Sequence, residues 1–401
     1  MGRFIRWLIV LVLPLAALSQ QSTTAPSQSA NSPQQNTAPA TQNPASQNNA
    51  PPTQNPPSQN NAPPQLQPRP AGPSLPPPSP TDRQITLDVQ VADRSGIAVR
   101  GLQKQDFTLL DDKQAKNIVS FHAVDSAAGP TTDPPVEVVL VVDAVNASFQ
   151  AVNYERNEIK KFLLANGGKL PLPVSLVVFT DAGAKIQDGS SRDGNALAAL
   201  YDQYETGVRT INRSQGFYGA AERYDLSLKT LTQLIAYQTP RPGRKLMIWF
   251  SPGWPLLSGP NVQLTGKEQQ SLFGSIVAAS TGLRQARITL YSVDPLGLAD
   301  AATVRISYYE DFLKGVASPS HTLPGDLGLQ VLVVQSGGRV FNSSNDLSAE
   351  IAHCASDADS FYVLSFDPAR ADQANEYHSI TVKINKSGIT ARTRTGYYAQ
   401  P

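Results

Sequence analysis

The stretch Val136-Glu-Val-Val-Leu-Val-Val-Asp143 decides the fold class of this 401-residue chain. A short, almost unbroken run of valine and leucine is typical of a strand that is buried on both faces of a parallel sheet. Asp143 ends the run, so we expect it at the carboxyl end of a central strand. Because open α/β sheets bind ligands at that edge, Asp143 is the first candidate site residue.

The residues after Asp143 predict a weak metal site at most. Hydroxyl groups two and four positions further on would complete an oxygen cluster for a hard divalent cation, but Val145 and Ala147 stand there. Asn146 and Ser148 are the remaining polar neighbours. We therefore expect no cofactor, with only weak binding of Mg²⁺ or Mn²⁺ at Asp143. A structural role is the alternative, in which Asp143 accepts N–H groups from the first turn of a helix.

Residues 135–358 alternate between strand and helix patterns. Compact apolar runs predict further strands at 174–180, 246–250 and 288–293. Apolar residues at helical spacing lie between them, and two later helices are expected at 325–335 and 347–357, flanking a short strand at 339–341. The series predicts an α/β fold with a doubly wound, mostly parallel, Rossmann-like sheet.

All-β patterns bracket this segment. Polar and apolar residues alternate from Ile85 to Val91, and further short strands are expected on both sides, at 107–110, 118–123, 361–366, 380–384 and 389–395. The few strands at each end would leave open sheet edges if they stood alone. We therefore predict that residues 84–130 and 359–401 form one β-sandwich, into which the α/β domain of residues 135–358 is inserted.

The N-terminal region predicts export and a tether. Arg3 and Arg6 precede an apolar run that ends at a small-residue cleavage site, so residues 1–19 are expected to be a signal peptide. Residues 20–83 are rich in Pro, Gln and Asn, which predicts a disordered linker. We expect a secreted or periplasmic protein, with no membrane insertion after cleavage and with the linker available for tethering to the envelope. Retention of the segment as an uncleaved anchor is the open alternative.

The charge balance disfavours two classes of partner. The chain has 33 basic and 32 acidic residues, and no Lys/Arg stripe follows the signal region. Neither nucleic acid nor an anionic membrane surface is an expected partner. A lone Cys354 allows no internal disulfide, which fits an exported bacterial protein.

Several phrases carry a resemblance to a known family. They are Gly101-Leu-Gln-Lys-Gln-Asp-Phe-Thr-Leu-Leu-Asp111, Ile118-Val-Ser-Phe121, Asp143-Ala-Val-Asn146, Gly243-Arg-Lys-Leu-Met-Ile-Trp-Phe-Ser251, Gly337-Gly-Arg-Val-Phe341, Phe361-Tyr-Val-Leu364 and Gly396-Tyr-Tyr398. In this order they resemble the VWFA-related family of exported bacterial proteins, and residues 135–358 resemble a von Willebrand factor type A domain. The resemblance implies a vWA-type sheet inserted in a β-sandwich.

The resemblance also implies where the metal site is degenerate. Type A domains bind a divalent metal through Asp-x-Ser-x-Ser after the first strand, a Thr from a later loop and an Asp after the fourth strand. Only Asp143 matches, and Ser251-Pro-Gly-Trp254 follows the fourth strand without an Asp.

The candidate binding surface lies at the same sheet edge. Ser251 and Trp254 follow the fourth strand, and the long loop with Arg213, Phe217 and Tyr218 is expected to reach the same rim. Exposed aromatic residues there would be interface material. In the alternative, Trp254 folds back against a helix and is buried, as most large apolar residues are.

These patterns predict a tethered protein-interaction module, for adhesion or scaffolding, that binds a protein or an extracellular polymer. Metal-dependent adhesion through Mg²⁺ or Mn²⁺ is the first alternative, and an envelope hydrolase is the second. We do not expect an enzyme, because Cys354 falls on the apolar face of its helix and no nucleophile elbow is present. The patterns make no prediction of oligomeric state.

Overall fold

The computed structural model describes residues 84–126, 135–205, 217–255, 257, 264–296 and 308–401. All of them belong to one compact unit. The expected signal peptide and linker, residues 1–83, lie outside the described residues. Where the chain is described, no helix has both the length and the apolar character required to cross a bilayer.

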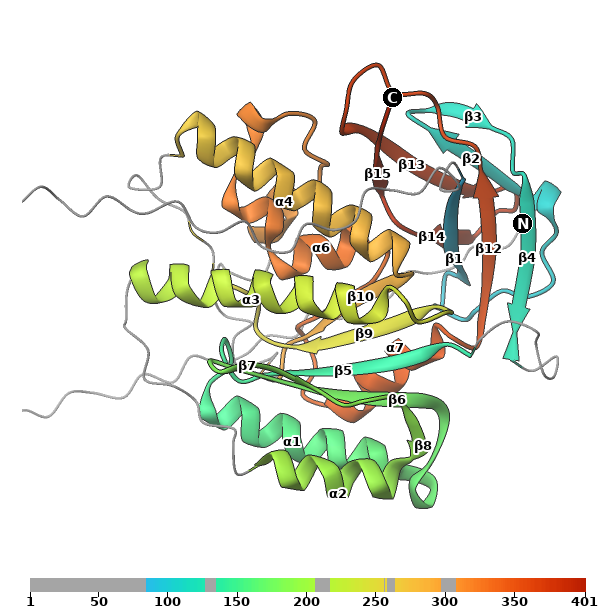
Figure 1. Ribbon diagram of the computed structural model, residues 1–401. Coiled ribbons are helices and arrows are strands. Elements are labelled where there is room, and N and C mark those ends of the chain that lie inside the picture. The colour runs from blue at the N-terminus through green and yellow to red at the C-terminus, as the bar shows by residue number, and fades with distance from the viewer. Residues whose placement is uncertain (1–83, 127–134, 206–216, 256, 258–263, 297–307) are drawn as a thin grey trace, which may run out of the picture. The chain divides into compact units, whose positions relative to one another are not determined.

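A mostly parallel sheet forms the centre of the α/β part (Figure 1). Its strands are β5 (Glu137–Asp143), β6 (Lys169–Thr180), β7 (Gly183–Ile186), β9 (Lys245–Phe250), β10 (Ile288–Val293) and β11 (Val340–Phe341), while β8 (Ser191–Asp193) pairs with β6. The spatial order is β11-β10-β9-β5-β6-β7, and only β7 and β8 run antiparallel to their neighbour. If these six strands are numbered 1 to 6 along the chain, leaving out β8, the order read from β7 to β11 is 3-2-1-4-5-6. This is the order of a doubly wound sheet.

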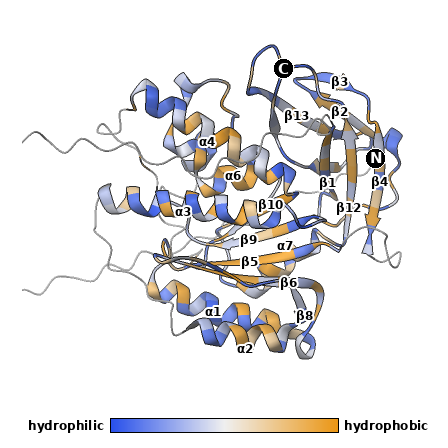
Figure 2. Cartoon of the chain, viewed as in Figure 1, coloured by the Kyte–Doolittle hydropathy of each residue, from blue (hydrophilic) through white to orange (hydrophobic). Residues whose placement is uncertain are grey.

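Helices cover both faces of this sheet. They are α1 (Phe149–Leu164), α2 (Gly194–Glu205), α3 (Phe217–Gln238), α4 (Gly266–Gln285), α6 (Leu329–Gln335) and α7 (Leu347–Ser356). Side chains alternate along β5, so Leu140 packs with α1, α2 and α7, while Val141 packs with α3, α4 and α6. Figure 2 shows apolar strands between helices that each turn one apolar face to the sheet.

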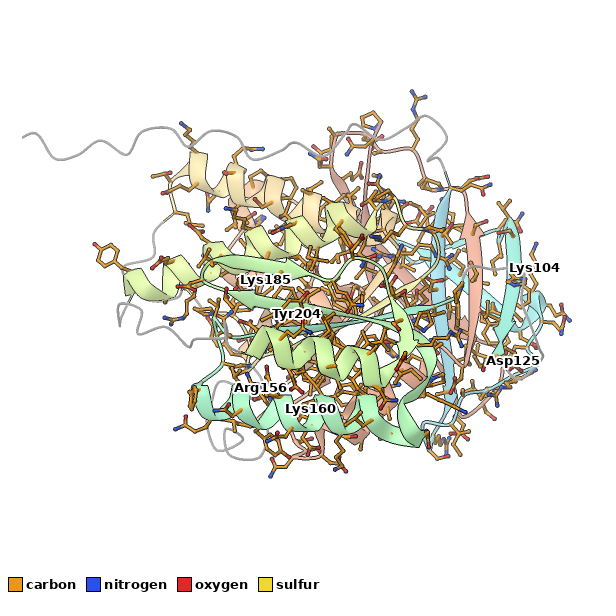
Figure 3. All side chains as sticks on the ribbon, turned by 60° about the horizontal axis from the view of Figure 1, so that its bottom comes forward. Lys104, Asp125, Arg156, Lys160, Lys185 and Tyr204 are labelled. Carbon is orange, nitrogen blue, oxygen red and sulfur yellow. The ribbon has the colours of Figure 1, made fainter. Side chains whose placement is uncertain are left out.

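Local polar contacts fix the helix ends. Ser148 accepts the N–H of Ala151 at 3.2 Å at the start of α1, and Thr265 forms a capping box with Glu268 at the start of α4. Short 3₁₀ helices connect other elements, at Lys104–Asp106, Ala165–Gly168, Tyr308–Phe312, Pro319–His321 and Pro324–Leu327. Lys160, labelled on α1 in Figure 3, forms an ion pair of 2.6 Å with Asp202 of α2.

Strands from both ends of the described chain build two antiparallel sheets. One has the order β14 (Ile389–Arg392), β1 (Ile85–Asp93), β12 (Ser360–Phe366), β4 (Ser120–Asp125). The other has the order β15 (Gly396–Ala399), β13 (Glu376–Ile384), β2 (Phe107–Asp111), β3 (Gln114–Lys116). Leu87 pairs with Leu364, and Leu109 pairs with Val382. These four side chains belong to one apolar core, so β1 to β4 are stabilised by strands that follow the α/β part.

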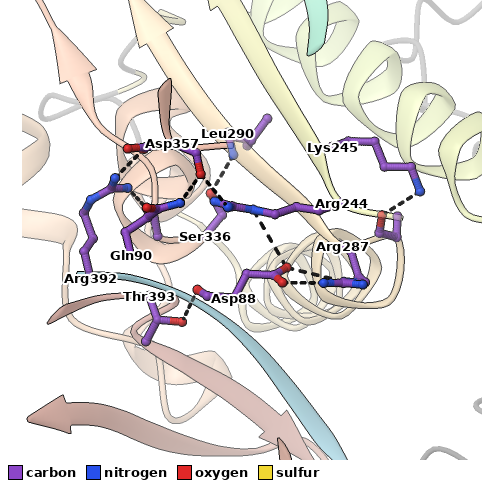
Figure 4. Close-up of polar contacts among 12 residues, drawn as sticks. Asp88, Gln90, Arg244, Lys245, Arg287, Leu290, Ser336, Asp357, Arg392 and Thr393 are labelled. Carbon is purple, nitrogen blue, oxygen red and sulfur yellow. Dashed lines mark hydrogen bonds and ion pairs between the residues drawn. The ribbon is translucent and has the colours of Figure 1, made fainter. Parts of the chain in front are cut away.

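A buried carboxylate joins the sheets to the α/β part at Asp357, just after α7 (Figure 4). Its side chain accepts hydrogen bonds from Tyr291 at 2.5 Å, from Arg339 at 2.7 Å and from Arg392 of β14. Its main-chain oxygen accepts from Arg244 at 3.0 Å. Burial would raise the pKa of Asp357, but the Arg392 and Arg339 guanidinium groups hold it below its usual value.

A second ionic contact joins the same two parts. Asp88 of β1 pairs with Arg287 at 2.5 Å and approaches Arg244 at 4.0 Å. Arg244 and Arg287 directly precede β9 and β10, so the amino ends of the parallel strands face the sandwich. The carboxyl edge of the sheet therefore lies at the end of the α/β part remote from the sandwich, as Figure 1 shows.

Candidate functional site

Asp143 lies where the sequence places it, at the carboxyl end of β5 in the middle of the sheet. Its Oδ1 accepts the backbone N–H groups of Val145 at 3.0 Å and Asn146 at 2.9 Å. Its Oδ2 accepts the Asn146 side-chain amide at 2.8 Å and the Trp249 indole N–H at 2.9 Å. The four N–H groups take up both oxygens, as expected for a carboxylate with a structural role.

Burial dominates the electrostatics of this carboxyl group. Asp143 is fully buried, and loss of water raises its pKa, an effect that hydrogen bonds from Asn146, Trp249 and Ser251 oppose. A divalent cation would have to displace some of these N–H groups from Asp143. It would gain few ligands in return, because the side chains of Val145 and Ala147 have no atom that can coordinate a metal. The residues around Asp143 do not fit a metal ion with near-octahedral oxygen coordination.

Asn146, Ser148 and Ser251 all lie close to Asp143. Asn146 joins β5 to α3, because its side-chain amide also donates to Ser227 at 2.9 Å. Ser148 is exposed and caps α1. Ser251 is buried next to Asp143, directly after the neighbouring strand β9, and its hydroxyl accepts the N–H of Gly253 at 3.2 Å. Of these three, Ser148 is exposed, whereas Asn146 is partly buried and its Oδ1 is buried without a hydrogen-bond partner among the described residues.

Trp254 is not a surface residue, which corrects the expectation of an exposed anchor. Its side chain is only 4% exposed and packs edge-on against Trp249, with ring centroids 5.3 Å apart. The chain turns back after β9 at Gly253, whose φ of +108° suits glycine. The expected alternative, in which Trp254 folds over the protein, is the observed one.

The long loop of the candidate surface is described only at its end. Arg213 lies outside the described residues, and Phe217 begins α3. Tyr218 is 84% exposed in the first turn of α3. The sequence analysis missed Phe149, which is 59% exposed in the first turn of α1. Because α1 and α3 both begin at the carboxyl edge of the sheet, the two rings lie at that edge, on helices that cover opposite faces of the sheet.

Glu155 is a second carboxyl group that the sequence analysis missed. It lies on the face of α1 that packs on the sheet and is fully buried. Neither of its oxygens has a hydrogen-bond partner among the described residues. Burial raises the pKa of Glu155 well above its usual value, and the nearby Asp143 carboxylate raises it further. Folding therefore favours the protonated form of Glu155.

Replacing Glu155 by methionine is expected to raise the free energy of unfolding by about 1–3 kcal/mol near neutral pH, because the buried carboxyl group has no partner. Folding raises the pKa of Glu155 above 4.5, so the folded state binds more protons and the wild type loses stability as pH rises above that value. The increase in the free energy of unfolding caused by Glu155→Met should therefore be larger at about pH 8 than at about pH 5. Urea denaturation at the two pH values measures it.

Glu158→Met on the same helix is the matched control, since Glu158 is partly exposed and pairs with Lys161. We expect it to change the free energy of unfolding by no more than about 0.5 kcal/mol. A loss of stability in Glu155→Met would show that Glu155 has a favourable partner and would refute this account of the residue.

The described residues offer little for nucleophilic catalysis. Cys354 is fully buried, and burial raises the pKa of its thiol well above the usual value, which disfavours the reactive thiolate. Ser318 Oγ lies 3.0 Å from His321 Nδ1, but this pair is exposed on one short 3₁₀ helix. A hydroxyl so open to water lacks the enclosed setting of an activated nucleophile.

Comparison with known proteins gives distant likeness only. No family model matches the chain, and no curated protein matches it. Among solved structures, human COPII-coat protein Sec24c is 10% identical with a TM-score of 0.31, over 70% of this chain and 46% of its own. The pilus adhesin SpaC from Lactobacillus rhamnosus GG is 11% identical with a TM-score of 0.36, over 77% and 48%. The PilB minor pilin from Streptococcus sanguinis is 12% identical with a TM-score of 0.32, over 57% and 62%.

The chain thus spans less than two thirds of the length of each of these proteins. Likeness at such TM-scores carries no inference about activity or partners.

Proposed function

We propose that this protein is an exported, tethered interaction module of the von Willebrand factor type A kind. It binds a protein or an extracellular polymer at the carboxyl edge of its parallel sheet and needs no metal at Asp143. The strand order 3-2-1-4-5-6, with an antiparallel strand at one edge, supports this assignment. Ligands of doubly wound sheets bind at that edge.

The observation that carries the proposal is the exposure of two aromatic rings at this edge. Phe149 and Tyr218 begin α1 and α3, and both are exposed. Aromatic side chains supply much of the binding energy of protein interfaces when a partner covers them. Ser148 lies between β5 and α1 and adds an exposed hydroxyl to the same surface.

The surroundings of Asp143 support recognition without a metal. In a metal-dependent site, the carboxylate keeps an oxygen available for the cation. Both oxygens of Asp143 instead accept N–H groups, including the indole N–H of Trp249. The carboxylate organises the edge from beneath the surface, and the exposed side chains make the contact.

Capture experiments with envelope extract test the rim. The tagged chain and its Phe149→Ser/Tyr218→Ser variant are compared for the proteins and polymers they retain. We expect the double variant to retain at least about tenfold less material than the wild type. It lacks two aromatic contacts, each of about 1–2 kcal/mol, that the partner would bury. The wild type should retain the same material in EDTA as in Mg²⁺.

Leu164→Ser/Ile97→Ser is the matched control. Both residues are exposed and apolar, but Leu164 ends α1 at the opposite edge of the sheet and Ile97 lies in the sandwich. The control variant should capture as the wild type does. Equal recovery by the Phe149/Tyr218 variant would reject the rim as the binding surface.

One observation favours metal-dependent adhesion as the second candidate. The carboxyl group of Glu155 has no hydrogen-bond partner among the described residues. It lies close enough to Asp143 for the Asp143 carboxylate to raise the pKa of Glu155. Mg²⁺ is usually bound through one or two carboxylates together with water. Capture that fails in EDTA, returns with Mn²⁺ and is lost in Glu155→Gln would favour this candidate over the first.

A further inference from the structure

A group of ligand-type side chains lies in the sandwich, far from the residues discussed so far. Asp111 ends β2, Asp112 begins the turn to β3, and His378 lies on the adjacent strand β13. Every second side chain of β2 is buried in the apolar core of the sandwich, at Phe107, Leu109 and Asp111. The third of these positions places a carboxylate in that core. A buried Asp requires charged or hydrogen-bonding partners.

Three atoms of this group converge. His378 Nδ1 lies 3.1 Å from Asp111 Oδ1 and 3.4 Å from Asp112 Oδ2. One ligand atom from each of the three residues falls within 4.8 Å of the others. Ligands about 2.0–2.1 Å from a tetrahedral cation lie about 3.3 Å apart, so the spacing of Nδ1 from both oxygens suits a metal ion.

The remaining oxygen of each carboxylate is held in place by other groups. Asp111 Oδ2 accepts hydrogen bonds from Tyr397 at 3.1 Å and from the N–H of Ala369 at 3.4 Å. Asp112 Oδ1 accepts the N–H and the hydroxyl of Ser379 at 2.8 and 2.9 Å. Each carboxylate thus directs its other oxygen at His378. Metal sites commonly orient their ligands through such outer contacts.

The ring proton of His378 would change its place when a metal binds. Nε2 is buried without a hydrogen-bond partner, and the nearest charged group is Glu376 Oε1 at 3.9 Å. Without a metal, Nδ1 carries the proton, because it faces two carboxylate oxygens and forms the hydrogen bond of 3.1 Å to Asp111 Oδ1. A metal ion on Nδ1 would replace that proton and leave the ring N–H on Nε2, towards Glu376. A carboxylate near the opposite N–H is typical of metal-bound histidine.

Charge gives a further argument. Asp111, Asp112 and Glu376 surround His378, and Lys116 Nζ is the one described cation paired with them, 3.7 Å from Asp111 Oδ2. Three carboxylates against one ammonium group leave an excess of negative charge beside a buried imidazole. A divalent cation would balance it.

We propose that Asp111, Asp112 and His378 bind a divalent transition-metal ion, with Zn²⁺ as the best match. One imidazole nitrogen with two carboxylate oxygens suits Zn²⁺ better than Mg²⁺ or Ca²⁺, which prefer oxygen ligands alone. Asp112 is exposed, so water can reach the ion and complete its coordination. The ion would join the β2–β3 turn to β13 and stabilise the sandwich. This site is independent of the proposed binding edge.

Calorimetric titration of the metal-free full chain with Zn²⁺ tests the site. We expect one saturable equivalent and a rise in melting temperature. Asp112→Asn keeps an acceptor for Ser379 but removes the charge, and it should weaken binding by roughly tenfold or more, as should His378→Gln. In ¹⁵N spectra of the imidazole rings, Zn²⁺ should shift the Nδ1 resonance of His378.

His353→Gln is the matched control. His353 is exposed and lies on α7, a helix of the α/β part rather than of the sandwich. It should bind Zn²⁺ as the wild type does. If His378→Gln fails to fold, Zn²⁺ binding by the Asp112→Asn variant still tests the site, because Asp112 is exposed. Absence of a saturable equivalent, or undiminished binding in Asp112→Asn, would overturn the proposal.

Discussion

Replacing Asp357 by alanine is expected to lower the free energy of unfolding by about 3–5 kcal/mol. The substitution leaves Arg392, Arg339 and the Tyr291 hydroxyl without the carboxylate they share in a buried position. Removing Asp357 is costly because the buried Tyr291 hydroxyl loses its acceptor, and the Arg392 and Arg339 side chains, 28% and 41% exposed, lose their common partner. Urea denaturation of the full chain measures the change.

Asp202→Ala provides the comparison for Asp357. Asp202 also forms an ion pair, with Lys160, but its carboxylate is 45% exposed, whereas that of Asp357 is 7% exposed. We expect a loss of no more than about 1 kcal/mol. Equal losses in the two variants would show that the Asp357 network does not join the sandwich to the α/β part in the way described.

Replacing Asp143 by alanine should cost about 3–5 kcal/mol, since buried N–H groups of Val145, Asn146 and Trp249 would lose their acceptor. The loss should be the same in EDTA and in millimolar Mg²⁺. A structural acceptor acts through hydrogen bonds, whereas a metal ligand stabilises the fold only when the metal is bound. Denaturation in the two buffers separates these roles.

Asp346→Ala is the control for Asp143, because Asp346 accepts a single N–H, that of Ala349, at the exposed start of α7. Loss of such a helix cap costs about 1 kcal/mol. A cost for Asp143→Ala that appears only with Mg²⁺ would contradict the structural role.

Buried strands were the most predictable part of the fold. The predicted strand at 288–293 is β10 itself, and the run ending at Asp143 is β5, because strands buried on both faces need continuous apolar sequence. The predicted helix at 325–335 is instead a 3₁₀ helix followed by α6, with the break at Gly328.

Short and partly exposed elements were harder to predict. The edge strands β7 and β8 carry few apolar residues, since solvent covers much of them, and they were missed together with α2. The expected strand at 389–395 is shorter, since β14 ends at Arg392, and β15 at Gly396–Ala399, in the other sheet, was missed. Their separation depends on which partner strands are near, and this is set by tertiary contacts rather than by local pattern.

The candidate site could be predicted only in part. Strand position identified Asp143 and its neighbours, but the burial of Trp254 depends on the turn at Gly253 and on its contact with Trp249. Periodicity contains two signals that the sequence analysis did not use. Glu155 falls on the apolar face of α1 with Val152 and Ile159, and Asp111 follows two inward-facing residues of β2. An acidic residue at a core position indicates a special role.

Titration with Mn²⁺, followed through the tryptophan indole N–H resonances, tests the central claim most directly. The chain has 3 tryptophans, and Trp249→Phe identifies the resonance of the indole bonded to Asp143. Paramagnetic Mn²⁺ bound at Asp143 would broaden this resonance strongly. We predict that it stays sharp and protected from exchange throughout the titration, because the indole N–H occupies Asp143 Oδ2. Its disappearance at stoichiometric Mn²⁺, with recovery in EDTA, would contradict recognition without a metal at this edge.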